Sequence, residues 1–168
     1  MARRELEFPQ GVLDCIEATR TRGTVLVASS RDGMNAMTIG WITIGSVWGR
    51  PCCTVLVRPS RYTYQFIEKG DSFTVNVLPE EMNEAVSLLG TRSGREIDKF
   101  TEAGIPAADS MKVQCPHIAE ADLVIECKTA MKQPIDSSLI FADYVHEAYA
   151  AGDYHTVYFG EILAMHAK

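Results

Sequence analysis

The chain of 168 residues has the length of one domain, and we expect residues 1–168 to form a single folded unit. Its net charge of −6 disfavours nonspecific nucleic-acid binding, and no apolar run approaches the roughly 20 residues of a membrane span. The basic start is followed by polar and acidic residues, so a signal peptide is not expected and a cytoplasmic location is.

Strand patterns dominate the first half of the chain. We expect strands over residues 24–28, 35–44, 52–58 and 72–77, with a turn at 48–51 between the second and third. Residues 72–77 alternate polar and apolar side chains, which predicts a half-buried strand. A helix is predicted over residues 61–69, with Ser60 as its N-cap and Gly70 at its end.

The second half contains one further helix and three more strands. The helix is predicted to begin at residues 78–81, with a proline and acidic residues in its first turn, and to stop at Gly90. Residues 91–100 form a polar loop, and strands are predicted over 121–131, 139–148 and 156–165. Because helices are few and do not alternate with strands, the pattern predicts a mainly β protein, a closed antiparallel barrel with a few appended helices.

The five cysteines predict reduced thiols, because an odd number with wide spacing does not match a disulfide framework. They are Cys15, Cys52, Cys53, Cys115 and Cys127. The vicinal pair is interpreted as two buried strand residues, since adjacent cysteines form strained disulfides. A metal site at Cys115, His117 and Cys127 is not expected, because the two closely spaced ligand pairs of a zinc site are missing.

The segment from Asn35 to Trp41 suits the edge of a flat heteroaromatic ring. Asn35 offers a donor and an acceptor, Thr38 a hydroxyl, and Trp41 a ring face or edge, beside the regularly spaced polar groups of a strand backbone. The alternative is structural, with Asn35 ending a turn and Trp41 filling the core.

The segment from Arg58 to Tyr64 suits a phosphate. Arg58 and Arg61 supply charge-assisted donors, Ser60 and Thr63 supply hydroxyls, and a helix N-terminus follows. The alternative is a capped helix with solvated arginines. Because a ring-binding and a phosphate-binding segment occur in order, the pair favours a mononucleotide cofactor, with FMN as the best candidate.

Lys99 lies in the polar loop and has two interpretations. A cation at the pyrimidine end of a flavin would stabilise negative charge on the reduced ring. Alternatively, Asp98 and Lys99 form an exposed charge pair, and the residues by themselves favour this second interpretation.

Five motifs in order resemble the flavin reductase-like family, especially its flavoredoxin-type branch, from about residue 10 to about residue 165. They are Asn35-x-Met37-Thr38-x-x-Trp41, the Arg61-Tyr62-Thr63 turn, the strand Phe73–Val77, Gly94-Arg95-x-x-Asp98-Lys99-Phe100, and His155-x-x-Tyr158-x-Gly160-Glu161-Ile162. The resemblance implies an FMN-binding split β-barrel, an antiparallel Greek-key barrel that works as a homodimer with FMN near the subunit interface.

Site residues follow from the resemblance by matching positions. Asn35, Met37, Thr38 and Trp41 would border the isoalloxazine ring, and Ser60, Arg61 and Thr63, with Arg58 as a helper, would hold the phosphate. Lys99 would reach the ring or its ribityl chain. No residue is assigned as catalytic. In one departure, residues 136–141, including Ser138, occupy a stretch where some members have a histidine.

The resemblance implies an FMN-dependent oxidoreductase that passes electrons from NAD(P)H through flavin to a small-molecule, metal or protein acceptor. Gly40, Gly45 and Gly49 lack the spacing of a dinucleotide fingerprint, so no separate Rossmann site is expected for NAD(P)H. One alternative is a flavoredoxin-like electron carrier without NAD(P)H activity, whose acidic charge would suit docking to a basic redox protein. Another is a non-enzymatic flavin-binding module. The acceptor and the choice between NADH and NADPH stay open.

Overall fold

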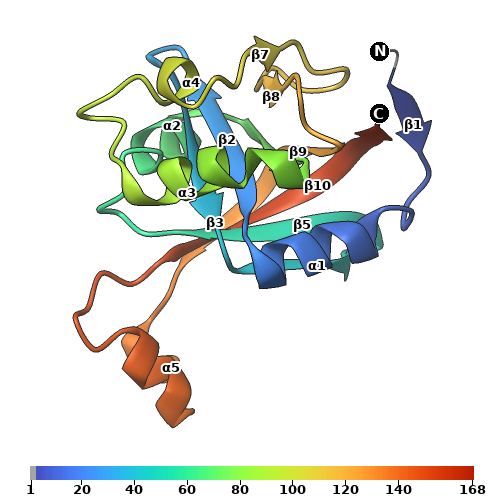
Figure 1. The fold of residues 1–168 in the computed structure, drawn as a ribbon. Helices are drawn as coiled ribbons and strands as arrows, with labels where there is room; N and C mark the ends of the chain where they lie inside the picture. The colour runs from blue at the N-terminus through green and yellow to red at the C-terminus, as the bar shows by residue number, and fades with distance from the viewer. Residues whose placement is uncertain (1–2) are drawn as a thin grey trace.

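The computed structural model describes residues 3–168, which form a mainly β fold with short helices (Figure 1). The strands are β1 (Arg4–Leu6), β2 (Thr24–Ser30), β3 (Gly33–Ile39), β4 (Ile42–Val47), β5 (Arg50–Val57), β6 (Ser72–Val77), β7 (Ala107–Ala108), β8 (His117–Ile118), β9 (Leu123–Pro134) and β10 (Thr156–Ala167). The α-helices are α1 (Val12–Thr21), α2 (Tyr64–Lys69), α3 (Asn83–Thr91), α4 (Lys99–Glu102) and α5 (Asp143–Ala148), and the 3-10 helices are η1 (Glu80–Met82) and η2 (Ser137–Leu139). No helix within residues 3–168 is long and apolar enough to cross a membrane.

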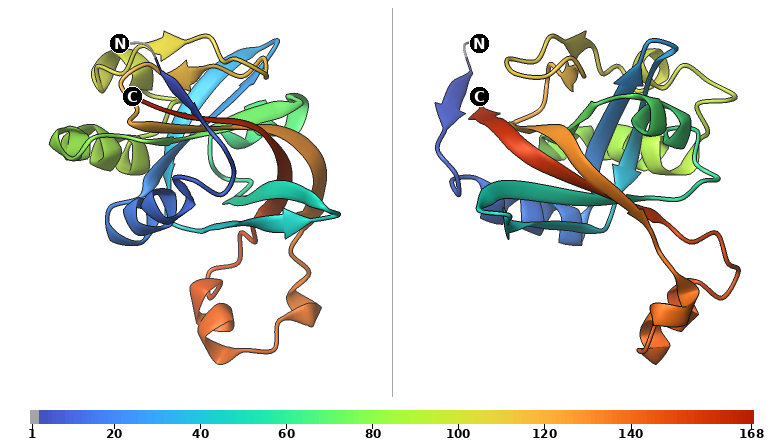
Figure 2. Two further views of the ribbon diagram at one scale, coloured as in Figure 1. Left: turned by 90° about the vertical axis from the view of Figure 1, so that its right-hand side faces the viewer. Right: turned by 180° about the vertical axis from the view of Figure 1, so that it is seen from behind.

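The main sheet is antiparallel and has the strand order β3-β2-β6-β9-β10-β5-β4, with β1 added beside β10. β3 and β4 are consecutive in the chain yet stand at opposite ends of this order. Only Gly40 and Trp41 connect them, so the two edges of the curved sheet must come close together at this point (Figure 2). The mainly β prediction is confirmed, and the barrel is split between β3 and β4 rather than closed.

β2 shows why two hydrophobic clusters form. Its side chains alternate between the faces of the sheet, so Leu26 and Ala28 enter the barrel interior, whereas Val25 and Val27 face outward. The outward cluster is covered by α3 and by the segment that includes Ile105 and β8. A strand in this position is buried on both faces, which accounts for its apolar run over residues 25–28.

The prediction that residues 72–77 form a half-buried strand is wrong about burial. All six residues of β6 are buried. Its polar side chains meet the covering segment instead of water. The Thr74 hydroxyl donates to the Pro116 carbonyl over 2.8 Å, and the Asn76 carbonyl oxygen accepts from the Ile118 amide at 2.9 Å. An alternating pattern cannot reveal that polar residues will be buried with partners.

The prediction of a strand over residues 139–148 is wrong. These residues form the end of η2 and helix α5, in an arm that projects from the barrel between β9 and β10 (Figures 1 and 2). The apolar residues Phe141, Tyr144, Val145 and Ala148 follow the i, i+3, i+4, i+7 spacing of a helix, which the strand interpretation overlooked.

Several predicted boundaries also shift, and three of the shifts have a structural cause. The strand expected over 35–44 is interrupted after Ile39 by the connection across the split. The helix expected from residue 61 begins at Tyr64, because the Ser60 side chain binds Asp153 instead of capping a helix. The helix expected over 78–90 divides into η1 and α3 and continues through Gly90, where an added Cβ would lie 3.3 Å from the Thr38 side chain.

The remaining elements were not expected from the sequence. They are β1, α1, α4, β7 and β8, most of them two to four residues long. The five cysteines are free, as predicted, and all are buried, as was predicted for Cys52 and Cys53.

Candidate functional site

The predicted site residues gather along the split of the barrel. A cavity of about 370 Å³ is lined by all of them except Trp41, namely Asn35, Met37, Thr38, Arg58, Ser60, Arg61, Thr63 and Lys99. An adjoining cavity of about 210 Å³ contains Trp41 and shares Met37, Thr38, Arg58 and Arg61 with the first. We call the two cavities together the split groove.

The floor of the split groove is a buried hydrogen bond between two predicted residues. The Asn35 amide donates to the Thr63 hydroxyl over 2.7 Å and to the Ala36 carbonyl over 3.2 Å. Gly94 lies directly over this pair. A Cβ added at Gly94 would lie 2.3 Å from the side-chain Oδ1 of Asn35 and 2.5 Å from the Tyr62 ring. The loop after α3 can therefore approach β3 only where a residue has no side chain.

Arg58 and Ser60 are already used by the protein. The Arg58 guanidinium donates to the carbonyls of Ala148, Gly152 and Asp153 over 3.1–3.3 Å. The Ser60 hydroxyl donates to the Asp153 carboxylate over 2.5 Å. These bonds anchor the returning end of the arm, so both residues shape the site as well as lining it.

Arg61 differs from Arg58 although both lie in the same turn. Within residues 3–168 its guanidinium donates no hydrogen bond to protein, and the residue is exposed. Its charge acts on the neighbouring groups nonetheless, since it contributes to lowering the pKa of both Lys99 and His155. Arg61 is therefore a cation whose donors are available to a bound anion.

Lys99 is buried at the split groove, which excludes the exposed Asp98–Lys99 pair. Only 5% of its surface is exposed, and its ammonium donates to the Leu89 carbonyl over 2.6 Å. Asp98 instead caps α4 by accepting from the Phe100 amide and the Thr101 hydroxyl. Desolvation, with a smaller contribution from Arg61, lowers the pKa of Lys99 to about 8.

Thr38 and Trp41 take different positions along the second cavity. The Thr38 hydroxyl donates to the Val86 carbonyl, which ties β3 to α3. Trp41 is 45% exposed, and its ring centroid lies 4.9 Å from that of His155. His155 is hydrogen-bonded to the Tyr149 hydroxyl, and desolvation, followed by the charge of Arg58, lowers its pKa to about 4. A neutral imidazole and an indole thus border this end of the split groove.

Several lining residues were not assigned to the site from the sequence. They are Tyr62, Arg92, Ser93, Gly94, Arg95, Asp153 and His155. Most of them lie in loops away from the two predicted segments, whereas Tyr62 lies within the second segment. Arg95 donates to the Ser60 carbonyl over 3.0 Å and lies 5.4 Å above the Tyr62 ring. Gly94 and Arg95 could have been predicted as site residues, because they lie in the same sequence motif as Lys99.

The charge of the split groove is strongly positive. Five cations line it, Arg58, Arg61, Arg92, Arg95 and Lys99, against one acid, Asp153. Since the whole chain carries −6, this local excess runs against the average and favours an anionic ligand.

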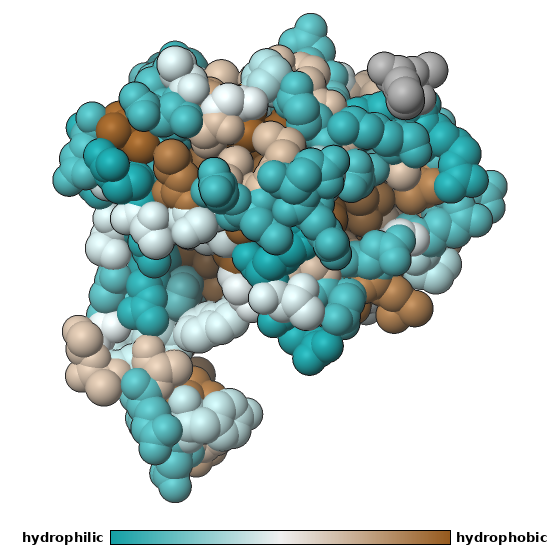
Figure 3. Space-filling view, viewed as in Figure 1, coloured by the Kyte–Doolittle hydropathy of each residue, from teal (hydrophilic) through white to brown (hydrophobic). Residues whose placement is uncertain are grey.

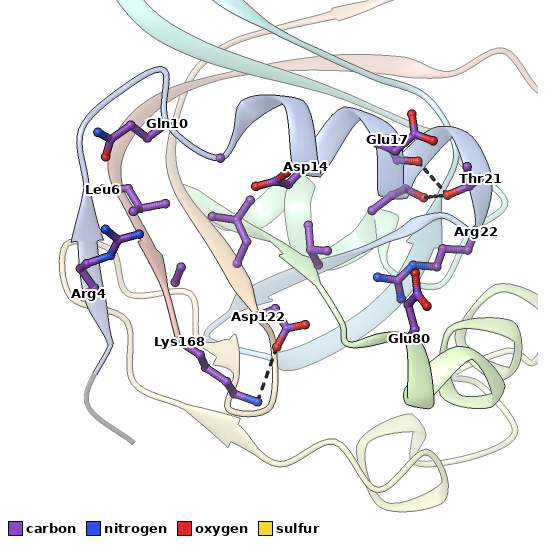
Figure 4. Close-up of a pocket in the computed structure, with 15 residues that line it drawn as sticks. Arg4, Leu6, Gln10, Asp14, Glu17, Thr21, Arg22, Glu80, Asp122 and Lys168 are labelled. Atoms are coloured by element: carbon purple, nitrogen blue, oxygen red, sulfur yellow. Dashed lines mark hydrogen bonds and ion pairs between the residues drawn. The ribbon is translucent and has the colours of Figure 1, made fainter.

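A larger cavity of about 680 Å³ lies elsewhere, beside α1 (Figure 4). Its charged side chains are mixed in sign, with Arg4, Arg22 and Lys168 facing Asp14, Glu17, Glu80 and Asp122. Lys168 and Asp122 lie 4.0 Å apart, so part of this charge is paired within the protein. Size therefore does not identify the site. The split groove is distinguished by its net positive charge, although Arg92 is paired with Glu96 at 3.9 Å.

Comparison with protein families assigns the fold. The model of the flavin reductase like domain matches residues 18–168. The chain belongs to this family. An uncharacterized protein from Archaeoglobus fulgidus is 28% identical over 152 residues, which cover 90% of this chain and 76% of that protein.

Two solved structures show the same split β-barrel. Flavoredoxin of Desulfovibrio vulgaris (Miyazaki F) has a TM-score of 0.69 and 23% identity over 88% of this chain and 70% of its own. An FMN-binding domain of a flavin reductases-like enzyme from Shewanella baltica OS155 has a TM-score of 0.68 and 18% identity over 99% of this chain and 77% of its own. At these identities the likeness concerns the fold.

Proposed function

We propose that this family member is an FMN-binding oxidoreductase that passes electrons from NAD(P)H through flavin to a small-molecule, metal or protein acceptor. One observation carries the proposal: Arg61, whose donors have no partner within residues 3–168, lies in a groove lined by five cations, beside a second cavity bordered by Trp41 and His155. The phosphate of FMN would bind in the cationic cavity, and its flat ring would lie in the second cavity.

The residues present fit FMN. Arg61 and Thr63 would hold the phosphate, and Arg58 and Ser60 would support that turn through the bonds they already make to residues 148–153. Gly94 leaves the close approach over Asn35 free of a side chain. When bound, FMN supplies the hydride and electron chemistry, while the protein supplies orientation and charge.

The ring end would be bordered by residues of the barrel split. Met37 and Thr38 present one edge from β3, and Trp41 reaches the second cavity from the connection to β4. Lys99 would place its charge beside the cofactor, since its ammonium is held at the Leu89 carbonyl and has two further donors.

A flavoredoxin-like electron carrier is the second candidate. The structural likeness to flavoredoxin and the net charge of −6 both favour it, because an acidic surface would steer a basic redox partner. The two candidates differ in whether NADH or NADPH reduces the protein directly.

Purification and stopped-flow absorbance separate these functions. We expect the protein to purify yellow or to become yellow with FMN, and the flavin absorbance to bleach within seconds of mixing with NADH or NADPH. Bound flavin that neither nucleotide bleaches would support the carrier, and failure to bind FMN would exclude both. The NADH and NADPH rates would then give the nucleotide preference.

We also propose that a second copy of the chain covers the projecting arm. Its apolar side chains are unusually exposed: Leu139 by 66%, Phe141 by 89% and Tyr144 by 75%. An apolar cavity of about 390 Å³ opens between the arm and Trp41. Figure 3 shows apolar residues on the arm where it stands apart from the barrel. Apolar surface of this kind is typical of an interface between subunits.

Light scattering tests the dimer. Wild-type protein should give twice the monomer mass of 18.6 kDa, and Phe141→Ser should shift the population toward monomer. Leu13→Ser is the matched control, because Leu13 is 80% exposed on α1, away from the arm. A wild-type mass of one chain at micromolar concentration would exclude the dimer.

A further inference from the structure

A second group of chemically active side chains lies outside the split groove, near the C-terminal end of β10. His117 on β8, Glu126 on β9 and His166 on β10 each offer one ligand atom, and these atoms all lie within 4.8 Å of one another. All three residues are buried, Glu126 and His166 completely. The proposed function does not use them.

The sheet register brings two of the three side chains to one face. Glu126 pairs with Ala164, and His166 follows two residues later on β10, so both point to the same side. Cys127, the next residue on β9, belongs to the barrel interior. The alternation of side chains along β9 therefore turns Cys127 away from this cluster and places Glu126 in it.

His117 is held in place from both sides. The Thr74 hydroxyl donates to the carbonyl of the preceding residue, Pro116, and Asn76 accepts from the amide of the following residue, Ile118. The two buried polar residues of β6 thus fix the backbone of β8 over the cluster. Rigid backbone on three strands is what a preorganised ligand set requires.

Two imidazole nitrogens in this cluster have no partner. Nδ1 of His117 and Nδ1 of His166 are buried and make no hydrogen bond within the described residues. Buried polar atoms are nearly always paired, so each unpaired one requires an explanation. Nε2 of His166 lies 2.8 Å from the Glu126 carboxylate. To ligate an ion together with Glu126, His166 would release this hydrogen bond, bind through Nε2 and carry its proton on Nδ1.

Glu126 provides the negative charge. Its carboxylate accepts from the amides of Met111 and Lys112 at 2.8 and 2.7 Å, and from His166. Two carboxylate oxygens offer about four acceptor positions, so one remains for a further partner.

We infer that His117, Glu126 and His166 form a binding site for one divalent transition-metal ion, with zinc the best match. Imidazole and carboxylate are zinc ligands, and three protein ligands leave a fourth tetrahedral position for water. Tetrahedral ligands at about 2.0–2.1 Å lie roughly 3.4 Å apart, so small side-chain movements would complete the site. The ion would join β8, β9 and β10 and would give the unpaired Nδ1 of His117 a partner.

Charges around the site are mixed. Besides Glu126 and His166, the charged groups that act on His117 are Arg3 and Asp109, and these two oppose one another. Arg3 itself is directed to the carbonyls of Ala119 and Ala121 at 2.9 and 2.7 Å. The Glu126 carboxylate is the anion in direct contact with the cluster, so its loss should weaken metal binding most.

The test measures retained metal in the full-length protein. After treatment with a chelator, the protein is incubated with zinc chloride, desalted and analysed for zinc by mass spectrometry. Wild type should retain one equivalent per chain, and His117→Gln should retain less than about a tenth of that. His146→Gln is the matched control, because it makes the same change at an exposed histidine on α5. Wild type without zinc, or equal retention in His117→Gln, would overturn the site.

Two further measurements keep the result interpretable. Zinc should raise the melting temperature of wild type and of His146→Gln but not of a His117→Gln protein whose circular dichroism matches wild type. X-ray absorption should show nitrogen or oxygen at about 2.0–2.1 Å and no sulfur at about 2.3 Å. Sulfur in the first shell would assign the ion to a cysteine and reject the proposed ligands.

Discussion

The split groove and the larger cavity beside α1 are both lined by charged side chains, but their charges are arranged differently. Beside α1, basic and acidic groups face one another, as the Lys168–Asp122 pair illustrates. In the split groove, five cations face one acid, and Arg61 has no protein partner within residues 3–168. A net excess of one charge in a cavity indicates a ligand better than the volume of the cavity does.

The largest effect should come from removing the donors assigned to the phosphate. Arg61→Ala with Thr63→Ala should weaken FMN binding by about 2–4 kcal/mol, roughly 30- to 1,000-fold in Kd. Riboflavin binding should change little, because riboflavin lacks the phosphate. Arg4→Ala, in the cavity beside α1, is the control and should leave both affinities unchanged. Fluorescence titration measures both ligands, and equal losses for the two would contradict the assignment.

A somewhat smaller effect is expected from filling the close approach over Asn35. In Gly94→Ala the new Cβ would overlap the Asn35 carbonyl oxygen and the Tyr62 ring, so the loop must move. Overpacking of this kind costs about 1–3 kcal/mol, and FMN affinity should fall with the displaced loop. Gly45→Ala is the matched control, since its Cβ would have no heavy atom within 4 Å. Titration with FMN and thermal melting of both variants provide the comparison.

Lys99→Met should have a moderate effect on FMN affinity and on the midpoint potential of the bound flavin. Removing one partly screened charge near the cofactor is worth on the order of 1 kcal/mol, so FMN affinity should fall several-fold. The midpoint potential of the bound flavin should drop by tens of millivolts, because about 30 mV corresponds to 1.4 kcal/mol for two electrons. Spectroelectrochemistry measures the potential. Wild-type values for potential and affinity would place Lys99 outside the cofactor site.

The smallest effect is expected in the pH dependence of the free energy of unfolding of the flavin-free protein. The pKa of Lys99 is about 8 in the fold against 10.5 ordinarily. Between these values the unfolded chain binds more protons, so the free energy of unfolding should gain a contribution that grows with pH, on the order of 1 kcal/mol. Urea unfolding of wild type and Lys99→Met across this range isolates the contribution as their difference. Parallel profiles would show that burial of Lys99 leaves its pKa unchanged.

Most of the residues that line the candidate site were predictable, because they lie in two short segments of the sequence. Residue types with suitable donors at 35–41 and 58–63 need only local order to be recognised, and eight of the nine predicted residues line one cavity. Strands with strong β patterns, such as 24–28 and 72–77, were also identified, because period-2 alternation and β-branched residues act locally.

Only the tertiary structure decided which of these groups are free. Arg58 and Arg61 are equivalent in the sequence, but the returning arm occupies Arg58 and leaves Arg61 available. Likewise, the neighbouring residues favoured an exposed Asp98–Lys99 charge pair. That prediction failed because α3 presents the Leu89 carbonyl to the Lys99 ammonium. His117, Glu126 and His166 are brought together by the pairing of β9 with β10 and by β6 bonding β8. Contacts between residues tens of positions apart depend on sheet register, so the sequence determined the chemistry and the fold determined its partners.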